Sequence, residues 1–196
     1  MRYWNSSPSS YRKLLAGLLV FTLCNSSDLF LLLKIKQGGT SDTETIGVYI
    51  FYNLVYAAAA FPFGILADRI GLKKIFITGL LLFTVVYAGM SRPGNWYWYG
   101  LLFFLYGLYA AATEGISKAW ISNISSKDDT ATAIGTYTGL QSICTLLAST
   151  LSGWLWFQFG AATAFWTCAI MSFLVAVYLF LIVPEPQIKK SGAQSQ

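Results

Sequence analysis

The sequence predicts an all-α membrane protein with six transmembrane helices, and two observations lead to this fold class. Of the 196 residues, 56% are apolar and 11% are charged, whereas soluble domains carry about a quarter charged residues. The apolar residues also fall into long blocks, and about 20 such residues form a helix that crosses roughly 30 Å of hydrocarbon. The six blocks are Leu14–Leu33, Ile46–Ala67, Ile75–Met90, Trp96–Trp120, Ala131–Phe157 and Ala161–Val183.

Each block is expected to be a helix, because lipid offers no hydrogen-bond partner to a free backbone group. The third block is short and needs flanking residues to complete a crossing. The blocks use nearly all of the chain between Leu14 and Val183, so we predict one membrane domain over residues 14–183. Residues 1–13 are then a cytoplasmic tail or a severed linker, and residues 184–196 are a second cytoplasmic tail.

The distribution of basic residues predicts the orientation. If the amino terminus is cytoplasmic, nine Lys and Arg residues lie on the inner side and three on the outer side, as the positive-inside rule requires. We therefore expect a multi-pass protein of the cell (inner) membrane with both termini in the cytoplasm. The membrane orientation explains the net charge of +5, so we predict no nucleic-acid partner. The inner residues are Arg2, Arg12, Lys13, Arg69, Lys73, Lys74, Lys127, Lys189 and Lys190, and the outer ones are Lys34, Lys36 and Arg92.

Several classes of protein are disfavoured by the residues that the chain lacks. It has no histidine, and its three cysteines, Cys24, Cys144 and Cys168, all lie within predicted spans. Their spacing matches no metal or disulfide pattern, so we interpret them as small buried residues. We predict no metal, no cofactor and no enzymatic activity.

A short internal repeat indicates how the six spans are related. Gly64–Leu66 and Gly71 recur 89 residues later as Gly153–Leu155 and Gly160. Each copy lies between the second and third spans of a three-span unit. Because three spans reverse the direction of entry, the second unit is inverted relative to the first. The chain is therefore expected to be an inverted 3+3 repeat, an arrangement found in halves of transporter folds.

The most specific stretch of sequence is Gly64–Lys74, GILADRIGLKK, at the predicted inner junction of the second and third spans. Its two glycines, seven residues apart, allow close helix approach and a tight turn. Asp68 is expected to bond backbone donors at the start of the next helix, where the helix dipole favours an anion. Arg69, Lys73 and Lys74 are expected to hold the cytoplasmic side. For the two lysines, the alternative is a basic loop that only sets orientation.

This stretch resembles the signature loop of the major facilitator superfamily, Gly-x-Leu-Ala-Asp-Arg-x-Gly-Arg-Arg/Lys, and departs from it at Leu72. The first block (FTLCNSSDLFLLLK) and the fourth (LYGLYAAATEGISKAW) are similar to the seventh and tenth helices of bacterial members with twelve spans. The resemblance implies the C-terminal half of a facilitator-type fold, in which the first and fourth spans line a central cavity. It also implies a loop that locks one inward- or outward-facing state, formed by Gly64, Asp68, Arg69, Gly71, Lys73 and Lys74.

Four consecutive polar residues, Asn25 to Asp28, lie inside the first span. Successive helix residues turn by about 100°, so four in a row cannot share one face. Either the span is locally unwound, as in discontinuous transporter helices, or several of its faces touch protein. Asp28 lies about 21 Å from the inner end, beyond the midplane. No cation lies one turn away and burial favours a neutral carboxyl group, so we hypothesise that Asp28 carries a coupling proton. The alternative is an Asp merely bonded to a neighbouring helix.

A second carboxylate lies in the fourth span, with Glu114 one helical turn before Lys118. This order favours their pairing. The two residues are candidates for an inner gate or an anchor for an ionic substrate, and a structural ion pair is the alternative. The 89-residue offset places Asn25 and Glu114 at equivalent positions of the repeat. Four tyrosines are further candidates for solute contact, with packing as their alternative: Tyr52, Tyr56, Tyr106 and Tyr109.

These observations predict a secondary transporter of a small organic solute, coupled to protons. Alternating access needs a second half that rocks against this one, so the expected partners are the lipid bilayer, the solute and a second six-helix half. That half is a second copy of this chain or a partner chain, unless the chain is an inactive truncated half. The alternative function is a non-transporting membrane assembly or regulatory subunit that retains the fold.

Overall fold

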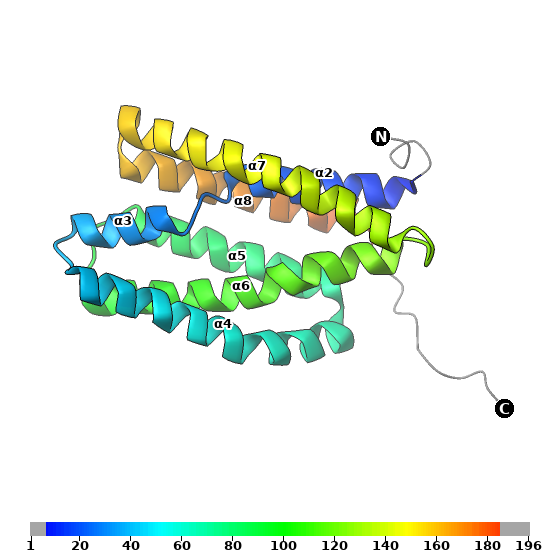
Figure 1. The fold of residues 1–196 in the computed structure, drawn as a ribbon, viewed down its shortest axis with the longest axis horizontal. Coiled ribbons are helices and arrows are strands. Elements are labelled where there is room, and N and C mark those ends of the chain that lie inside the picture. The colour runs from blue at the N-terminus through cyan, green and yellow to red at the C-terminus, as the bar shows by residue number, and fades with distance from the viewer. Residues whose placement is uncertain (1–6, 185–196) are drawn as a thin grey trace.

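The computed structural model describes residues 7–184, and within this range the protein is a bundle of helices without strands. Residues 1–6 and 185–196, which belong to the two predicted tails, lie outside the described range. Helices are labelled as in Figure 1. They are α2 (Ser9–Cys24), α3 (Leu29–Gln37), α4 (Asp42–Ile70), α5 (Leu72–Met90), α6 (Trp96–Ile124), α7 (Thr130–Phe159) and α8 (Ala161–Ile182).

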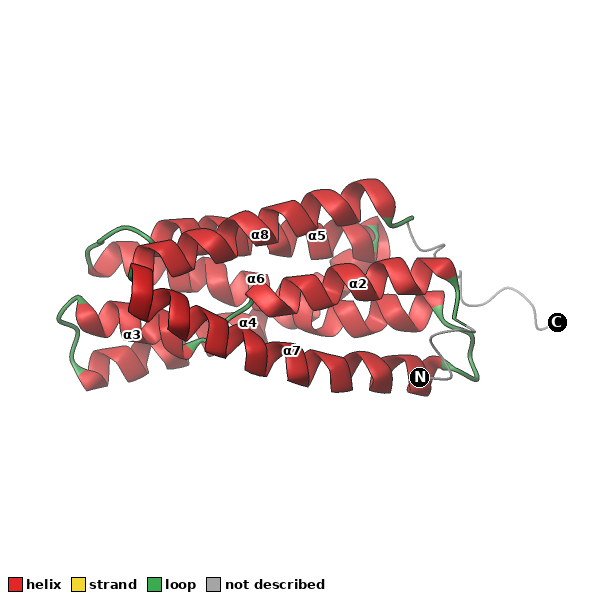
Figure 2. Ribbon diagram, turned by 90° about the horizontal axis from the view of Figure 1, so that it is seen from above, coloured by secondary structure: helices red, strands yellow, loops and turns green. Residues whose placement is uncertain are grey.

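The seven helices make six passes along the bundle, because α2 and α3 together form the first pass. The connections alternate between the two ends, so α2 begins and α8 finishes at the same end (Figure 1). Figure 2 shows the loop that separates α2 from α3 within the first pass. The predicted all-α fold is confirmed for the described residues. The short third block is completed by flanking residues, since α5 begins at Leu72, three residues before the predicted Ile75.

The passes differ in how apolar they are. Five helical segments are long and apolar enough to cross a membrane, with α2 and α3 counted as one segment. The exception is α7, whose 30 residues are rich in Ser, Thr and Gln. Several exposed hydroxyls of α7 donate to the carbonyl oxygen four residues back, as Thr138 does to Ile134 and Ser142 does to Thr138. These bonds satisfy the hydroxyls within the helix and lower the cost of placing them in an apolar environment.

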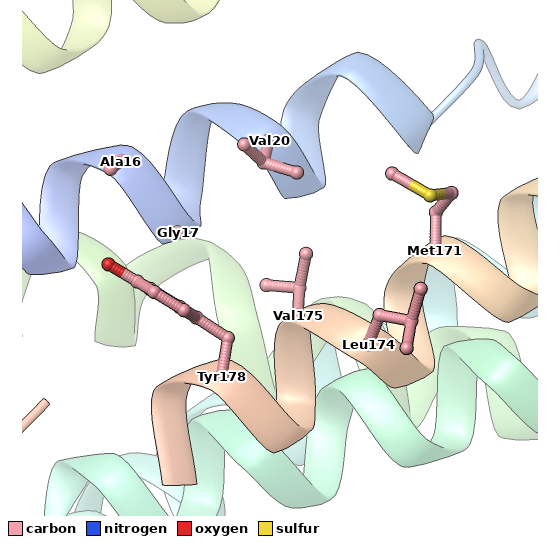
Figure 3. Close-up of a pocket in the computed structure, with 7 residues that line it drawn as sticks. All are labelled: Ala16, Gly17, Val20, Met171, Leu174, Val175 and Tyr178. Carbon is pink, nitrogen blue, oxygen red and sulfur yellow. The ribbon is translucent and has the colours of Figure 1, made fainter. Parts of the chain in front are cut away.

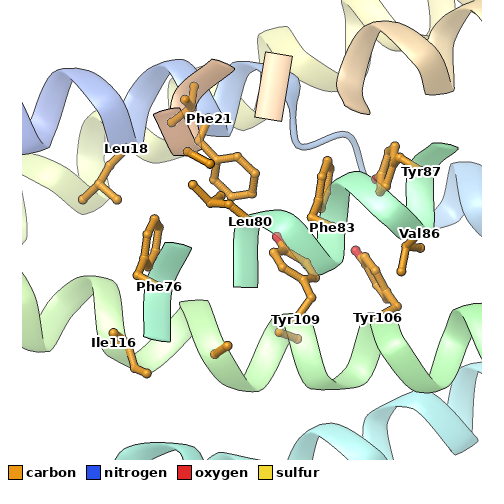
Figure 4. Packing of buried hydrophobic residues seen from close by; sticks show 14 of the residues in the cluster. Leu18, Phe21, Phe76, Leu80, Phe83, Val86, Tyr87, Tyr106, Tyr109 and Ile116 are labelled. Carbon is orange, nitrogen blue, oxygen red and sulfur yellow. The ribbon is translucent and has the colours of Figure 1, made fainter. Parts of the chain in front are cut away.

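The helices form two groups of three that meet along α5 and α8. In one group α4 and α5 pack on α6, and in the other α2, α7 and α8 pack on one another. Aromatic side chains fill the space between the groups, where Phe21 of α2 lies edge-on to Phe83 of α5 at 5.2 Å between ring centroids (Figure 4). Edge-to-face pairs of this kind stabilise a core beyond simple burial. The core therefore fixes α2 against α5 and α6.

Caps stabilise two helix starts at the end of the bundle opposite the start of α2 (Figure 1). Ser41 and Glu44 form a reciprocal capping box at the start of α4. At the start of α6, the Asn95 side chain accepts a hydrogen bond of 2.9 Å from the Trp98 backbone N–H. Each such cap is worth about 1 kcal/mol, because it pairs a backbone donor that has no partner inside the helix.

Single glycines link the last two helices of each predicted repeat unit. Gly71 lies between α4 and α5 with φ of 106°, and Gly160 lies between α7 and α8 with φ of 84°. Side chains disfavour this left-handed region, so glycine permits a reversal that uses one residue. The two glycines, 89 residues apart in sequence, have the same structural role.

Candidate functional site

The first pass is interrupted by the polar residues that the sequence analysis singled out. Helix α2 finishes at Cys24 and α3 begins at Leu29, so Asn25 to Asp28 are not helical. Asn, Ser and Asp bond nearby backbone groups in non-helical conformations, which weakens a helix at such a run. The prediction of a locally unwound span is therefore confirmed.

Three of the four polar side chains of the break contact tyrosine hydroxyls, and the tyrosines come from three helices; the fourth, Ser27, accepts from the Leu29 backbone N–H. The Asn25 amide donates to Tyr109 of α6 at 2.9 Å. Ser26 lies 3.2 Å from the hydroxyl of Tyr87 of α5. The Asp28 carboxylate accepts from Tyr106 of α6 at 2.5 Å and also from Tyr52 of α4. The second alternative in the sequence analysis also holds, because different faces of the break touch different helices.

We call Tyr52, Tyr87, Tyr106 and Tyr109 the tyrosine cage. Tyr106 and Tyr109 rise from α6 toward α5 and α2, and Tyr87 lies near them on α5 (Figure 4). All four side chains are buried. Buried phenol groups need hydrogen-bond partners, and the break supplies them. Tyr52, Tyr106 and Tyr109 were candidates from the sequence, whereas Tyr87 was missed. The signal for it was the single phenol of the third apolar block, Ile75–Met90.

Asp28 has no cationic partner among residues 7–184. The one ion pair within 4.0 Å in this range joins Lys36 and Asp42 at 2.6 Å, at the end of α3 and the start of α4. Two tyrosine donors therefore compensate the Asp28 carboxylate in place of a cation. Hydrogen bonds to a charged acceptor are stronger than those between neutral groups, which makes this arrangement tolerable inside an apolar bundle.

Glu114 lines a polar cavity of about 50 Å³ next to the cage. Its carboxylate is exposed on the cavity side, and Tyr56 of α4 faces it. The oxygen of the Asn25 amide is buried there without a hydrogen-bond partner in the described structure. Such an atom favours a donor from a ligand or water. The cavity is lined by Phe21, Thr22, Asn25, Phe76, Tyr109, Thr113, Glu114, Ser117, Tyr137 and Gln141.

The structure brings some of the predicted site residues together and separates others. Asn25 and Glu114 line the same cavity. Asn25 and Asp28 belong to the same non-helical segment between α2 and α3. Lys118 is exposed and does not line the cavity. It lies beyond ion-pairing distance of Glu114, so the structural ion pair that we considered as an alternative is not formed.

The predicted lock loop lies at the end of the bundle where α2 begins and α8 finishes (Figure 1). Gly64 is within α4, and Asp68 and Arg69 are exposed near the end of that helix. The expected cap by Asp68 is wrong, because Gly71 takes the N-cap position before α5 and no side chain caps that helix in the described residues. Leu72, where the signature loop has a basic residue, is buried.

Lys73 has a role that the sequence did not reveal. Its ammonium group is buried and donates to the carbonyl oxygens of Phe180 at 2.9 Å and Val183 at 2.5 Å. Phe180 lies in the last turn of α8 and Val183 is its C-cap residue. Carbonyls at a helix C-terminus lack partners within the helix, and the helix dipole favours a cation there. Lys73 therefore ties α5 to the end of α8. Lys74, by contrast, is exposed.

The comparison with protein families identifies the fold. A family model described as Major Facilitator Superfamily matches residues 14–196. The chain belongs to this superfamily. An uncharacterized MFS-type transporter of Methanocaldococcus jannaschii is 36% identical over 143 residues, covering 70% of this chain and 36% of the relative. The multi-drug resistance efflux pump PmrA of Streptococcus pneumoniae is 29% identical over 140 residues, covering 71% of this chain and 35% of the pump.

A solved structure shares the fold of this chain. The POT family transporter PepTSo matches with a TM-score of 0.73 at 15% identity, over 89% of this chain and 37% of that protein. At this identity the match shows the fold alone. The chain spans about a third of the length of the curated relatives it matches. It is a multi-pass membrane protein of a transporter superfamily, a class that is generally not enzymatic.

Proposed function

We propose that the chain forms one six-helix half of a secondary carrier that moves a small organic solute across the cell (inner) membrane. In this proposal, protons are coupled to transport at Asp28 and both termini are cytoplasmic. One observation carries it: Asp28 lies at a break in a membrane-spanning helix, compensated by Tyr52 and Tyr106 and by no cation among the described residues. Ionisable groups at such positions mark ion and substrate pathways.

The two tyrosine contacts explain how a proton can act on the bundle. An ionised carboxylate only accepts hydrogen bonds, so Asp28 can receive both hydroxyls at once. A protonated carboxyl group donates one bond itself, so one tyrosine must turn its hydroxyl to accept that bond, and the charge-assisted bonds become weaker neutral ones. Because Tyr52 belongs to α4 and Tyr106 to α6, protonation weakens the attachment of the break to one of these helices. Proton binding is in this way linked to helix contacts.

The cavity at Glu114 supports an organic cation as the solute. Its acceptors are the Glu114 carboxylate and the unpaired Asn25 oxygen, and its walls include Phe21, Phe76 and Tyr109. Aromatic faces attract cations. The relatives named as drug-resistance proteins, among them PmrA and a bicyclomycin resistance protein homolog of Haemophilus influenzae, favour an organic molecule over an inorganic ion. A solute amine could bridge the two acceptors.

The second half of the carrier would cover α4 and α7. Within the most apolar 18-residue stretch of α4, only 11% is buried against other helices of the chain. The corresponding share for α6 is 61%. In this proposal the covering half is a second copy or a partner chain, and it contacts the lock loop through Asp68 and Arg69. Lys73 does not take part in that contact, because α8 already binds its ammonium group.

Transport by purified protein tests the proposal. The full chain is reconstituted into liposomes, and uptake of ethidium, an aromatic organic cation, is followed with and without a pH gradient. We expect proton-driven uptake by the wild type, none by Asp28→Asn and unchanged uptake by the control Asp42→Asn, whose carboxylate pairs with Lys36. Asp28→Asn with full proton dependence would overturn the coupling role. A stable monomer that neither binds nor moves ethidium would overturn the carrier and favour the regulatory subunit.

A further inference from the structure

An apolar groove runs between α2 and α8, away from the tyrosine cage. It has a volume of about 270 Å³. Its lining consists of Ala16, Gly17, Val20, Met171, Leu174, Val175 and Tyr178 (Figure 3). The Tyr178 hydroxyl donates to the Lys13 carbonyl oxygen at 3.1 Å and closes one end. No residue of the cavity at Glu114 takes part, so the groove is separate from the proposed solute site.

The depth of the groove follows from small residues on α2. At Gly17 the two helices touch, because an added Cβ would lie 2.7 Å from Leu179 of α8. On either side of this contact, Ala16 and Val20 leave space that larger residues would fill. The rims are open to the surroundings of the chain, with Val20 39% and Leu174 53% exposed. On the surface of a membrane helix, an open apolar groove such as this one takes an apolar occupant.

Two basic residues stand directly beyond one end of the groove. Arg12 precedes Ala16 by one helical turn, and Lys13 precedes Gly17 by the same interval, so both continue the groove face of α2. Both side chains are exposed, and neither forms an ion pair within the described residues. Long basic side chains extend from apolar helix surfaces to the polar membrane boundary. The positive end of the α2 dipole lies at the same place.

We propose that this groove binds an anionic glycerophospholipid, with an acyl chain between α2 and α8 and the phosphate held by Arg12 and Lys13. The groove and the basic pair match the two parts of a phospholipid. The apolar groove, which lies about 6–12 Å along α2 from Arg12 and Lys13, fits an acyl chain, and the basic pair fits the phosphate. Basic pockets between membrane helices bind anionic head groups in this way. An apolar helix of another subunit would fill the channel but would leave the basic pair without an anion. The proposal does not depend on transport.

Lipid titration of the purified full chain tests this site. Native mass spectrometry measures binding of phosphatidylglycerol and of phosphatidylcholine with the same acyl chains. We expect phosphatidylglycerol to bind more tightly. The double variant Arg12→Gln/Lys13→Gln should weaken its binding about tenfold to thirtyfold, and leave phosphatidylcholine unchanged, because each basic group near an anionic lipid contributes separately. The control Lys127→Gln removes an exposed cation at the same end of the bundle and should change neither.

Filling the groove tests the acyl part of the site. Ala16→Phe should weaken binding of both lipids, whereas Ala162→Phe, at an exposed position near the opposite end of α8, should not. If Ala16→Phe fails to fold, Val20→Trp fills the groove from a position that is already exposed. Equal binding of the two lipids by the wild type, or unchanged phosphatidylglycerol binding by the double variant, would overturn the proposal. So would a dimer that Ala16→Phe dissociates, because another protein chain would then occupy the groove.

Discussion

The first and fourth passes occupy equivalent positions in the predicted repeat, yet only the first is broken. Asn25 to Asp28 interrupt the first pass, whereas α6 continues without interruption through Glu114 to Ile124. The difference follows from local sequence. Four polar residues that compete for backbone hydrogen bonds unwind the first pass, while Glu114 follows three alanines and a threonine, and alanine is the best helix former.

This difference gives the two carboxylates different surroundings. Asp28, on the broken pass, is held by two tyrosine hydroxyls. Glu114, on the continuous helix, points into the cavity, where Tyr56 faces it from a less buried position. When a carboxylate accepts hydrogen bonds from two helices, binding of a proton changes those bonds and the contacts between the helices. One that faces an open cavity is available to a ligand. In the proposed carrier, the carboxylate for proton coupling and the one for solute binding would therefore lie in different repeat units.

The largest expected effect is loss of a cage hydroxyl. Tyr106→Phe should lower the free energy of unfolding by about 2–3 kcal/mol, because it removes a donor from the Asp28 carboxylate inside the bundle. Tyr56→Phe removes the hydroxyl that faces Glu114, and should cost less than about 0.5 kcal/mol because that carboxylate is not enclosed by the described residues. Unfolding in detergent, followed by tryptophan fluorescence, measures both. Equal costs would contradict the contrast between the carboxylates.

The next effect concerns Lys73, which ties the first unit to the last helix of the second. Lys73→Met should cost about 1.5–3 kcal/mol, since it removes charged hydrogen bonds to the end of α8. Lys118→Met, at an exposed cation of α6, serves as the control and should change stability by less than about 0.5 kcal/mol. The same unfolding measurement applies. An unchanged stability of Lys73→Met would show that α8 does not need this cation.

The two glycine links should respond alike. Gly71→Ala and Gly160→Ala each place a side chain at positive φ, and we expect each to cost about 1 kcal/mol or more. No atom lies close enough to clash with the added Cβ at either position, so backbone strain alone sets the cost. Thermal unfolding of the two variants compares the links directly. If the two substitutions changed stability by clearly different amounts, the two glycine links would not be equivalent.

The smallest effect on stability is expected at Glu114. Glu114→Gln keeps the shape of the side chain, and the exposed carboxylate should contribute less than about 0.5 kcal/mol to folding. Ethidium affinity should nevertheless fall about tenfold, because a cation loses its charged partner in the cavity. Fluorescence titration of the purified protein measures the affinity. A large loss of stability together with unchanged affinity would assign Glu114 to the fold instead of the solute.

The carboxylate sites could be found from sequence more easily than their partners. Asp28 and Glu114 stood out because ionisable residues are rare within apolar blocks, and the unwound break followed from four polar residues in a row. The partners of Asp28 were beyond prediction, because Tyr52 and Tyr106 lie 24 and 78 positions away in the sequence. The same holds for Lys73, which reaches Val183 across 110 positions. Local pattern carries no information on such distant pairs.

The sequence by itself determined the helices and the number of passes, because apolar length and backbone satisfaction in lipid allow almost no alternative. It also marked the residues that do not belong in hydrocarbon. Only the tertiary structure decided that Asp28 is met by tyrosines, that Lys118 stands apart from Glu114, and that Lys73 holds the end of α8. These pairings depend on which faces the packed helices turn toward one another. The shapes of many side chains set that choice together, and no single stretch of sequence encodes it.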